Sequence, residues 1–254
     1  MITEEHQRNG GVGRAPPVAI LKNSPLGNPG RIAQFFSERG IAFTLIDISA
    51  GDPVPDSPDG FAGLVVLGGP MSVNDPLPWV EAECALIRRA APRIPVAGHC
   101  LGAQLMARAF GQPVTRNPVR EFGWGELEVR DAALAREWLG EFATGPVPTL
   151  HWHGETFGLP TGARLMLSSR HCEHQAFVLD DRHLGLQCHF ETAPDAVRGW
   201  AQTAAGAIAR DVARGAPGSQ PVAEILRELD MRTARIHRVL DALYARWVQG
   251  LRGT

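Results

Sequence analysis

Basic side chains are in no excess in this sequence, and lysine is almost absent. Lys22 is the one lysine among 254 residues, and arginine and lysine together number 25 against 27 aspartates and glutamates. The formal net charge is -2 at pH 7, and no basic run occurs. Because recognition of a polyphosphate needs concentrated positive charge, we expect no nucleic-acid partner.

Long apolar runs are missing as well. No uninterrupted apolar stretch approaches the roughly 20 residues that a helix needs to cross a bilayer, so we expect no membrane partner. Residues 1–17 are polar and rich in glycine and proline, and they lack the apolar centre of a signal peptide. We therefore expect a flexible N-terminal segment over residues 1–17 and a protein that stays in the cytoplasm.

Cysteine is scarce, and its four positions show no disulfide framework. The spacing of Cys84, Cys100, Cys172 and Cys188 fits a reducing compartment, where a thiol remains available for chemistry. Hydrophobic residues make up 44% of the sequence, so a chain of this length can bury one sizeable core.

Short apolar runs alternate with helical patterns over the first hundred residues. Glycine, proline and aspartate bound each run, which is typical of buried strands separated by turns. The alternation predicts βαβ crossovers and a central, mostly parallel sheet with both faces covered, which is a three-layer α/β sandwich. The expected strands span residues 18–21, 42–48, 61–67 and a run from residue 96, and the expected helices span 30–39 and 78–91.

The second half of the chain is less regular. Its strand candidates span residues 124–129, 149–154, 164–168, 175–179 and 184–188, and its helical patterns span 132–142, 194–208 and 222–251. The last helix carries an apolar stripe at helical spacing, which includes Ile236, Leu240 and Leu243. This stripe either packs on its own domain or forms the surface of a homodimer or of another partner.

The stretch Gly98-His99-Cys100-Leu101-Gly102 follows an apolar run and precedes a helical pattern. It has the G-x-nucleophile-x-G spacing of a nucleophile elbow, a sharp strand-to-helix turn that lifts the central side chain above the sheet. The two glycines admit backbone where a Cβ would clash, and the N-terminus of the following helix favours a thiolate. A buried structural cysteine is the alternative, but the flanking pattern favours Cys100 as a nucleophile.

The third apolar run ends in Gly68-Gly69-Pro70. Ligands of open α/β sheets bind at the carboxyl ends of the strands, so this turn should lie near Cys100. A tight turn that needs glycine would explain the pair equally well. If Cys100 is a nucleophile, the N–H groups of Gly69 and Leu101 are the expected oxyanion donors.

His189 and Glu191 follow the last strand candidate. A thiol nucleophile needs a base, and that base needs a third group to fix its tautomer. Side chains two residues apart at a strand end can lie on one side of the backbone. A structural histidine and a helix-initiating acid are the alternative, but together with the elbow the pair predicts a triad of Cys100, His189 and Glu191.

His151 and His153 are also two residues apart, a spacing that puts both on one face of a strand and could serve a metal. Neither an H-x-x-x-H helix nor a Cys-x-x-Cys pair completes a recognisable site, and the nearby His171-Cys172-x-His174 cluster adds little. We therefore predict no metal and no cofactor.

Three separated motifs, around Gly69, Cys100 and His189, resemble those of the class I (triad) glutamine amidotransferases. The resemblance spans roughly residues 18–191 and implies a flavodoxin-like amidotransferase domain over 18–192. The helical patterns that follow predict a C-terminal helical extension over 193–254. It is strongest to stand-alone members similar to the glutaminase component of GMP synthase, through Gly69-Pro70-Met71-Ser72-Val73 and His153-Gly154-Glu155-Thr156-Phe157. The sequence departs from the commoner pattern at Cys188 and Phe190, where an aromatic residue and a proline usually flank the histidine.

The resemblance also implies a role for each site residue. Cys100 would attack the side-chain amide of glutamine, His189 would shuttle the proton, and Glu191 would orient His189. The α-amino and α-carboxylate groups of the substrate would be held by Gln104 and by the backbone around His153 and Gly154.

Three functions remain open. The first, which we favour, is a glutaminase that releases ammonia through a Cys γ-glutamyl thioester, with a separate synthetase or another acceptor as its partner. The second is a free-standing γ-glutamyl peptide or amine hydrolase, which needs no partner. The third is a catalytically silent regulatory protein on the same fold, although the intact Cys100, His189 and Glu191 argue against it.

Overall fold

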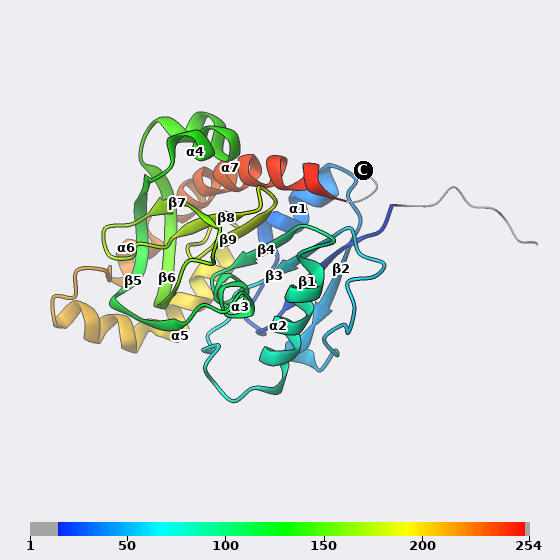
Figure 1. Cartoon of the computed structure of the whole chain (residues 1–254). Coiled ribbons are helices and arrows are strands. Elements are labelled where there is room, and N and C mark those ends of the chain that lie inside the picture. Colours follow the sequence, from blue (N-terminus) through cyan, green and yellow to red (C-terminus); the bar gives the residue numbers. More distant parts are fainter. Residues whose placement is uncertain (1–14, 252–254) are drawn as a thin grey trace, which may run out of the picture.

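The computed structural model describes residues 15–251. The first 14 residues of the predicted flexible N-terminal segment lie outside this range. The described chain forms a nine-stranded sheet in the order β2-β1-β3-β4-β9-β8-β7-β5-β6 (Figure 1). Helices cover both faces of this sheet, so the predicted α/β sandwich is confirmed.

One half of the sheet is parallel. Its neighbours β2-β1-β3-β4-β9 all pair in the same direction, as expected for strands joined by helical crossovers. Strands β3 and β4 are buried along their whole length because helices lie on both faces, which explains their uninterrupted apolar runs. The strands are β1 (Val18–Lys22), β2 (Phe43–Asp47), β3 (Gly63–Val66), β4 (Val96–His99) and β9 (His183–Leu186).

The other half of the sheet is antiparallel, so the predicted parallel arrangement describes the β2-to-β9 half. Strand β5 (Val114–Val129) is much longer than the expected 124–129, and β6 (Val147–Phe157) is longer than 149–154. The register of this pair shifts between Arg116 and Glu121, and such a shift breaks the simple alternation from which a strand is predicted. The remaining strands are β7 (Arg164–Ser168) and β8 (Ala176–Leu179).

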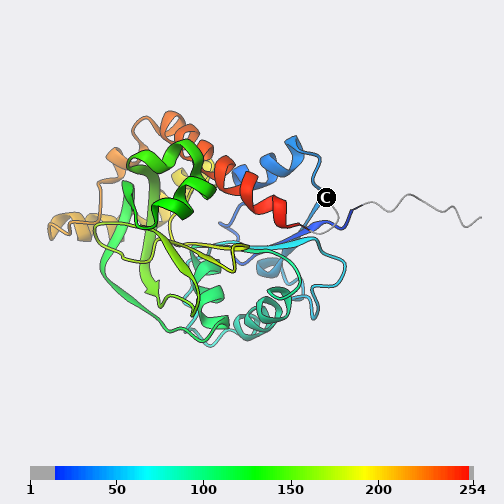
Figure 2. The ribbon, with the colours of Figure 1, turned by 45° about the horizontal axis from the view of Figure 1, so that its top comes forward.

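The helices form two layers around the sheet. On one face, α2 (Pro78–Ala90) and α3 (Leu101–Ala109) bury apolar side chains against β1, β3 and β4. Figure 2 shows the opposite layer on the other side of the sheet. That layer contains α1 (Gly30–Glu38), α4 (Ala132–Leu139), α5 (Pro194–Ala213), α6 (Val222–Leu226) and α7 (Leu229–Trp247). Short 3-10 turns are η1 (Ile48–Ala50), η2 (Gly140–Thr144) and η3 (Val248–Gly250).

The predicted helix over residues 222–251 is two helices. The chain bends between α6 and α7 at Glu228, whose φ of 51° lies in the left-handed region and interrupts helical geometry. The apolar stripe of α7 packs into the core of its own chain, where Ile236, Leu240 and Leu243 are fully buried. Met231 of the same helix is exposed. The stripe thus packs on its own domain, and a homodimer stays a prediction.

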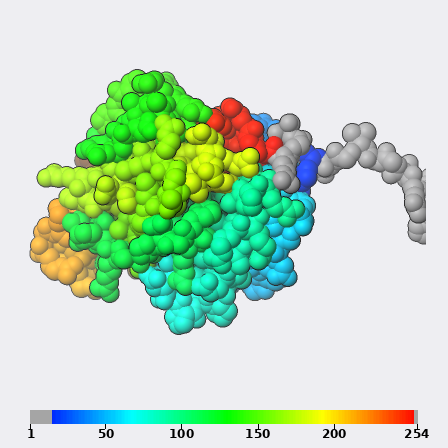
Figure 3. Space-filling model, in the orientation of Figure 1, coloured from blue at the N-terminus to red at the C-terminus, as the bar shows by residue number. Residues whose placement is uncertain are grey.

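The space-filling view shows how the layers close over the sheet. The yellow-green segment that includes β7, β8 and β9 lies between the green α4 above and the teal α2 below (Figure 3). Among residues 15–251, no helix combines the length and the apolar character that crossing a membrane requires.

Candidate active site

Cys100 lies at the junction of β4 and α3, with φ 49° and ψ −106°. A positive φ in a residue other than glycine costs on the order of 1–3 kcal/mol, so the surrounding fold must hold this turn. Neighbouring glycines make it feasible. A Cβ on Gly98 would come within 2.5 Å of the backbone of Gly102, and one on Gly102 would come within 2.0 Å of the Val66 carbonyl oxygen. The elbow is therefore a close backbone approach that only glycine permits on both sides of Cys100.

The Cys100 sulfur is nearly buried and touches two polar groups. Nε2 of Gln187 donates to the sulfur at 3.5 Å, and the Trp152 carbonyl oxygen lies 3.9 Å away. Gln104, on α3, donates through Nε2 to Oε1 of Gln187 at 3.0 Å. The side chain of Gln104 thus reaches Cys100 through Gln187, to which the sequence analysis gave no role.

His189 and Glu191 lie together, as their two-residue spacing predicts. Oε1 of Glu191 accepts a hydrogen bond from Nδ1 of His189 at 2.6 Å, which fixes the ring's orientation. Nε2 of His189 is buried and has no hydrogen-bond partner among the described residues. The position that a Cβ would take on Gly68 lies 3.4 Å from Cys100 Cβ and 3.6 Å from His189 Cε1. The structure therefore brings Cys100, His189 and Glu191 to one place.

His189 and Glu191 each favour the charged form of the other. Burial by itself raises the pKa of Glu191, but His189 and His99 outweigh it and hold that pKa well below its usual range. Burial lowers the pKa of His189, but Glu191 and Cys100 outweigh it and raise the pKa above its usual range. Glu191 is therefore an anion, and His189 is readily protonated beside it.

A second histidine shares the carboxylate. Oε2 of Glu191 accepts hydrogen bonds from Nδ1 of His99 at 3.2 Å and from the Phe190 N–H at 3.0 Å. Nε2 of His99 lies 2.8 Å from the hydroxyl of Tyr244 on α7. Burial and Glu191 raise the pKa of Tyr244, so its hydroxyl keeps its proton and donates to His99. A continuous set of hydrogen bonds thus connects α7 to Glu191.

The predicted oxyanion donors lie beside the elbow. A Cβ on Gly69 would sit 3.1 Å from Leu101 Cδ2, so the Gly68-Gly69 turn after β3 lies against the start of α3. Leu101 is the first residue of α3, and the first N–H groups of a helix have no acceptor within it. The structure brings Gly69 and Leu101 together with Cys100, and their role as oxyanion donors stays a prediction.

A cavity of about 790 Å³ opens over these residues. Its wall includes Gly69, Cys100, Gln104, His153, Gly154 and His189, which are predicted site residues. The imidazole of His153 is 1% exposed, and its Nε2 lies 3.0 Å from Oε2 of Glu121. Gly154 lies beneath Arg120, whose Nε would be 3.3 Å from a Cβ at that position. A contribution of residues 153–154 to substrate binding would therefore come from the backbone, as predicted.

The other cysteines differ from Cys100 in their surroundings. None of the four takes part in a disulfide. Burial raises the pKa of Cys84 and of Cys172 to about 11, and it also raises the pKa of Cys188. A thiol whose pKa is raised in this way holds its proton at neutral pH and is a poor nucleophile.

The sequence predicts that His151 and His153 share one face of a strand, and the structure adds a third polar group beside them. His151 and His153 face Glu121 on the neighbouring strand β5, and all three side chains are buried. Burial lowers the pKa of His151 to about 4, so this imidazole is neutral. The third group could not be recognised in the sequence because Glu121 is about 30 residues away and pairs with His153 across a shifted register.

Comparisons with known proteins agree with this geometry. The family model of class-I glutamine amidotransferases matches residues 27–198. The glutamine amidotransferase-like protein YfeJ of Salmonella typhimurium is 32% identical over 179 residues, covering 68% of this chain and 74% of that protein. The crystal structure of a glutamine amido transferase from Methylobacillus flagellatus superposes with a TM-score of 0.86 at 40% identity, covering 94% of this chain and 96% of that one.

A GMP synthase (glutamine-hydrolyzing) from Paraburkholderia phymatum is 32% identical over 135 residues. This match covers 51% of the chain described here and 25% of that enzyme, so the chain spans about a quarter of the synthase's length. Together with the match to the family model over most of the chain, these similarities establish its class. The chain belongs to the class-I glutamine amidotransferase family. It is similar over nearly its whole length to the Methylobacillus protein.

Proposed function

We propose that this chain is a glutaminase that hydrolyses the side-chain amide of glutamine through a γ-glutamyl thioester on Cys100. The observation that carries the proposal is the hydrogen bond between His189 and Glu191 beside a strained cysteine at the wall of a cavity. A thiol, a base and an orienting carboxylate are the groups that nucleophilic amide hydrolysis needs.

In the first half of the reaction, Nε2 of His189 takes the proton of the Cys100 thiol, and the resulting thiolate attacks the amide carbon to form a C–S bond. The carbonyl electrons move to oxygen, and the N–H groups of Gly69 and Leu101 stabilise that oxyanion. His189 gives a proton from Nε2 to the amide nitrogen as the C–N bond breaks. Ammonia leaves, and the γ-glutamyl group remains on Cys100 as a thioester.

In the second half, water replaces the sulfur. Nε2 of His189 takes a proton from the water, and the resulting hydroxide attacks the thioester carbon. The C–S bond breaks and its electron pair returns to Cys100, which releases glutamate. The Glu191 carboxylate holds the imidazolium that forms in this step, as its 2.6 Å contact with Nδ1 allows.

The ammonia acceptor of this reaction is a further part of the proposal. The GMP synthases that the chain resembles are named glutamine-hydrolyzing, and it spans about a quarter of one of them. We propose that a separate synthetase subunit takes the ammonia from this chain. Binding of that subunit would align the Gly69 and Leu101 donors. Loss of one oxyanion donor lowers kcat by about 10²–10³, so a change in the position of either N–H group is sufficient to switch the activity.

A γ-glutamyl peptide or amine hydrolase is the second candidate. The cavity of about 790 Å³ favours it, because glutamine alone would fill a small part of such a volume. The chemistry at Cys100 would be the same, with an amine or a peptide leaving in place of ammonia.

Steady-state kinetics of the purified chain separate these functions. Glutamate release would be measured with glutamine and with a panel of γ-glutamyl peptides and amines. Detectable glutaminase activity that rises when a synthetase partner is added supports the proposal. Fast cleavage of a γ-glutamyl peptide by the isolated chain, with negligible activity on glutamine, would overturn it in favour of the second candidate.

Covalent labelling identifies the nucleophile in the same preparation. A chloroketone analogue of glutamine should alkylate the Cys100 peptide, and Cys100→Ser should remove both the label and the activity. Cys84→Ser is the matched control, because Cys84 is buried on α2 with its sulfur 3.7 Å from the Leu105 carbonyl oxygen. Absence of labelling in the wild-type chain would indicate a silent regulatory protein.

A further inference from the structure

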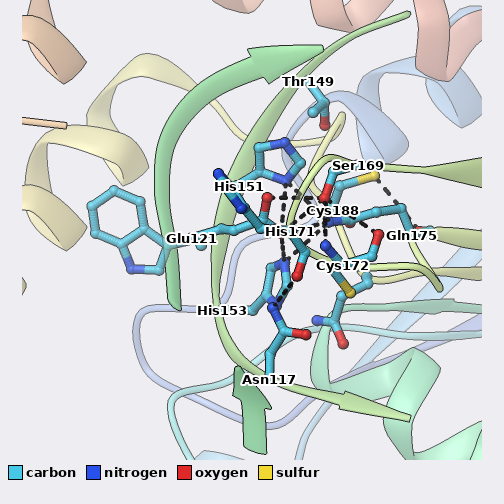
Figure 4. A network of polar contacts seen from close by, with 12 residues as sticks. Asn117, Glu121, Thr149, His151, His153, Ser169, His171, Cys172, Gln175 and Cys188 are labelled. Carbon is cyan, nitrogen blue, oxygen red and sulfur yellow. Dashed lines mark hydrogen bonds and ion pairs between the residues drawn. The ribbon is translucent and has the colours of Figure 1, made fainter. Parts of the chain in front are cut away.

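The side chains of Glu121, His151 and His153 meet inside the antiparallel half of the sheet (Figure 4). Glu121 on β5 stands opposite His153 on β6, and His151 lies on the same face of β6, two residues before it. Gln175, immediately before β8, enters the cluster from the other side. All four residues are at most 6% exposed.

At the contact between Nε2 of His153 and Oε2 of Glu121, neither atom has an evident hydrogen to donate. Nδ1 of His153 lies 2.9 Å from the Glu155 carbonyl oxygen, which can only accept, so Nδ1 carries a hydrogen. In a neutral ring Nε2 is then an acceptor, yet it lies 3.0 Å from Oε2 of the Glu121 carboxylate. Two acceptors at this distance need a proton or a metal ion between them.

The side-chain amide of Gln175 also has fewer hydrogens to donate than it has polar neighbours. Its Nε2 has two hydrogens but lies near four polar atoms, at 2.8 Å from Glu121 Oε2, 3.0 Å from Ser169 Oγ and 3.3 Å from each of His151 Nδ1 and His153 Nε2. Its Oε1 is buried and has no hydrogen-bond partner among the described residues. The two ends of an amide have nearly the same shape, so rotation by half a turn would bring this oxygen into the cluster.

We propose that Glu121, His151 and His153 bind a divalent transition metal, with zinc as the ion of choice and Gln175 Oε1 or a water molecule as fourth ligand. Two imidazoles and one carboxylate form a donor set that suits zinc. The three donor atoms lie within 4.8 Å of one another. Zinc bonds of about 2.0–2.2 Å place tetrahedral ligands roughly 3.4 Å apart, so shifts of about 1 Å complete the site.

Outer contacts already orient two of these ligands. The Glu155 carbonyl oxygen holds Nδ1–H of His153, which aims Nε2 at the centre. The Ser169 hydroxyl contacts both carboxylate oxygens of Glu121, at 2.9 and 3.1 Å. Hydrogen bonds of this kind fix the tautomer and direction of metal ligands in known sites.

The site would support the cavity rather than take part in the reaction. His151 and His153 flank Trp152, whose carbonyl oxygen lies 3.9 Å from the Cys100 sulfur. A metal would join β5, β6 and the segment before β8 behind this wall. The expected consequence is a more stable chain in the metal-bound form, since an ion that binds the folded state alone stabilises it.

Metal analysis of the untagged full-length chain tests the proposal. We expect about one equivalent of zinc per chain after purification without chelators. After removal of zinc, Co²⁺ should give the intense visible absorption of a tetrahedral site, and Zn²⁺ should displace it and raise Tm. Glu121→Gln and His153→Gln should each weaken Zn²⁺ binding at least tenfold. His174→Gln is the matched control, because this histidine bonds the Phe157 carbonyl oxygen outside the cluster.

Two outcomes would overturn the proposal. If the wild-type chain holds no zinc and shows neither a Co²⁺ spectrum nor a change in Tm, a proton bridges the pair instead. If both variants bind Zn²⁺ as tightly as the wild type, the ion lies elsewhere. The Co²⁺ spectrum of the wild-type chain decides the matter even if a variant fails to fold.

Discussion

The hydroxyl of Tyr244 lies 2.8 Å from Nε2 of His99 and thereby ties the C-terminal helix α7 to the candidate active site. His99 is fully buried, and its other nitrogen contacts Glu191 at 3.2 Å. Tyr244 is the one tyrosine in the sequence, and it touches neither Cys100 nor His189 by hydrogen bond in the described structure. It is therefore placed to position the carboxylate from outside the site.

Tyr244→Phe should lower kcat by about two- to tenfold with little change in KM. The variant removes one hydrogen bond, worth about 0.5–1.5 kcal/mol, and leaves Nε2 of His99 without its donor. Thr233→Val is the matched control, because the Thr233 hydroxyl is also buried on α7 but bonds the helix's own Leu229 carbonyl oxygen. If both variants lose stability equally and neither changes kcat, Tyr244 has a structural role alone.

Glu191→Gln should reduce kcat less than His189→Ala does. The imidazole moves the proton, and its loss should cost about 10²–10⁴ in kcat, whereas glutamine still offers an oxygen to Nδ1. The carboxylate also raises the pKa of His189, so the basic limb of the kcat profile should move to lower pH in Glu191→Gln. Profiles of kcat and KM against pH measure both effects. A rise in KM at constant kcat would instead make Glu191 a binding residue.

Cys100→Gly should be more stable than Cys100→Ala by about 1 kcal/mol, although both lack the sulfur. Glycine adopts the φ of 49° without the strain that alanine keeps, and this gain exceeds its larger loss of chain entropy on folding. Urea unfolding of the two variants measures the difference. Ala103→Gly, in the first turn of the same helix, is the control and should lose stability instead. Equal stability of the two Cys100 variants would show that the strain in the elbow does not exceed the entropy cost of glycine.

Local patterns were sufficient to predict the parts of the site that lie on one stretch of chain. Gly98 and Gly102 identified the elbow because each glycine is required by a backbone contact within that turn and with β3. His189 and Glu191 lie two residues apart at a strand end, so their proximity needed no knowledge of the fold. The alternation of runs and helices likewise predicted the parallel half of the sheet.

Contacts between distant segments could not be predicted in the same way. His99 meets Tyr244 across 145 residues, and the pairing of Glu121 with His153 depends on an irregular register between β5 and β6. A one-residue change in that register would turn Glu121 to the opposite face of the sheet. Such relationships follow from tertiary packing and carry no periodic signal.

Glu83 is a buried carboxyl group that takes no part in the proposed reaction. It lies on α2 and is completely inaccessible to solvent. Nδ2 of Asn23 donates to its Oε2 at 3.2 Å, and its Oε1 has no hydrogen-bond partner among the described residues. Burial raises the pKa of Glu83 to about 8, an effect that the Asn23 contact offsets in part. The folded chain therefore keeps a proton on Glu83 that the unfolded chain releases near pH 4.5.

Glu83→Gln should make the chain more stable than the wild type, and the difference should grow as pH rises from 5 to 8. Because the folded-state pKa is raised, the stability associated with Glu83 is fully present below about pH 4.5 and is lost as pH rises through 8. Glutamine carries no charge and escapes this loss, which amounts to on the order of 4 kcal/mol at pH 8. Urea unfolding at pH 5, 6.5 and 8 measures the difference.

Glu128→Gln is the control, because the Glu128 side chain is 70% exposed, and it should show a nearly constant difference from the wild type. Parallel stability curves for Glu83→Gln and the wild type would mean that Glu83 is ionised in the folded chain at neutral pH.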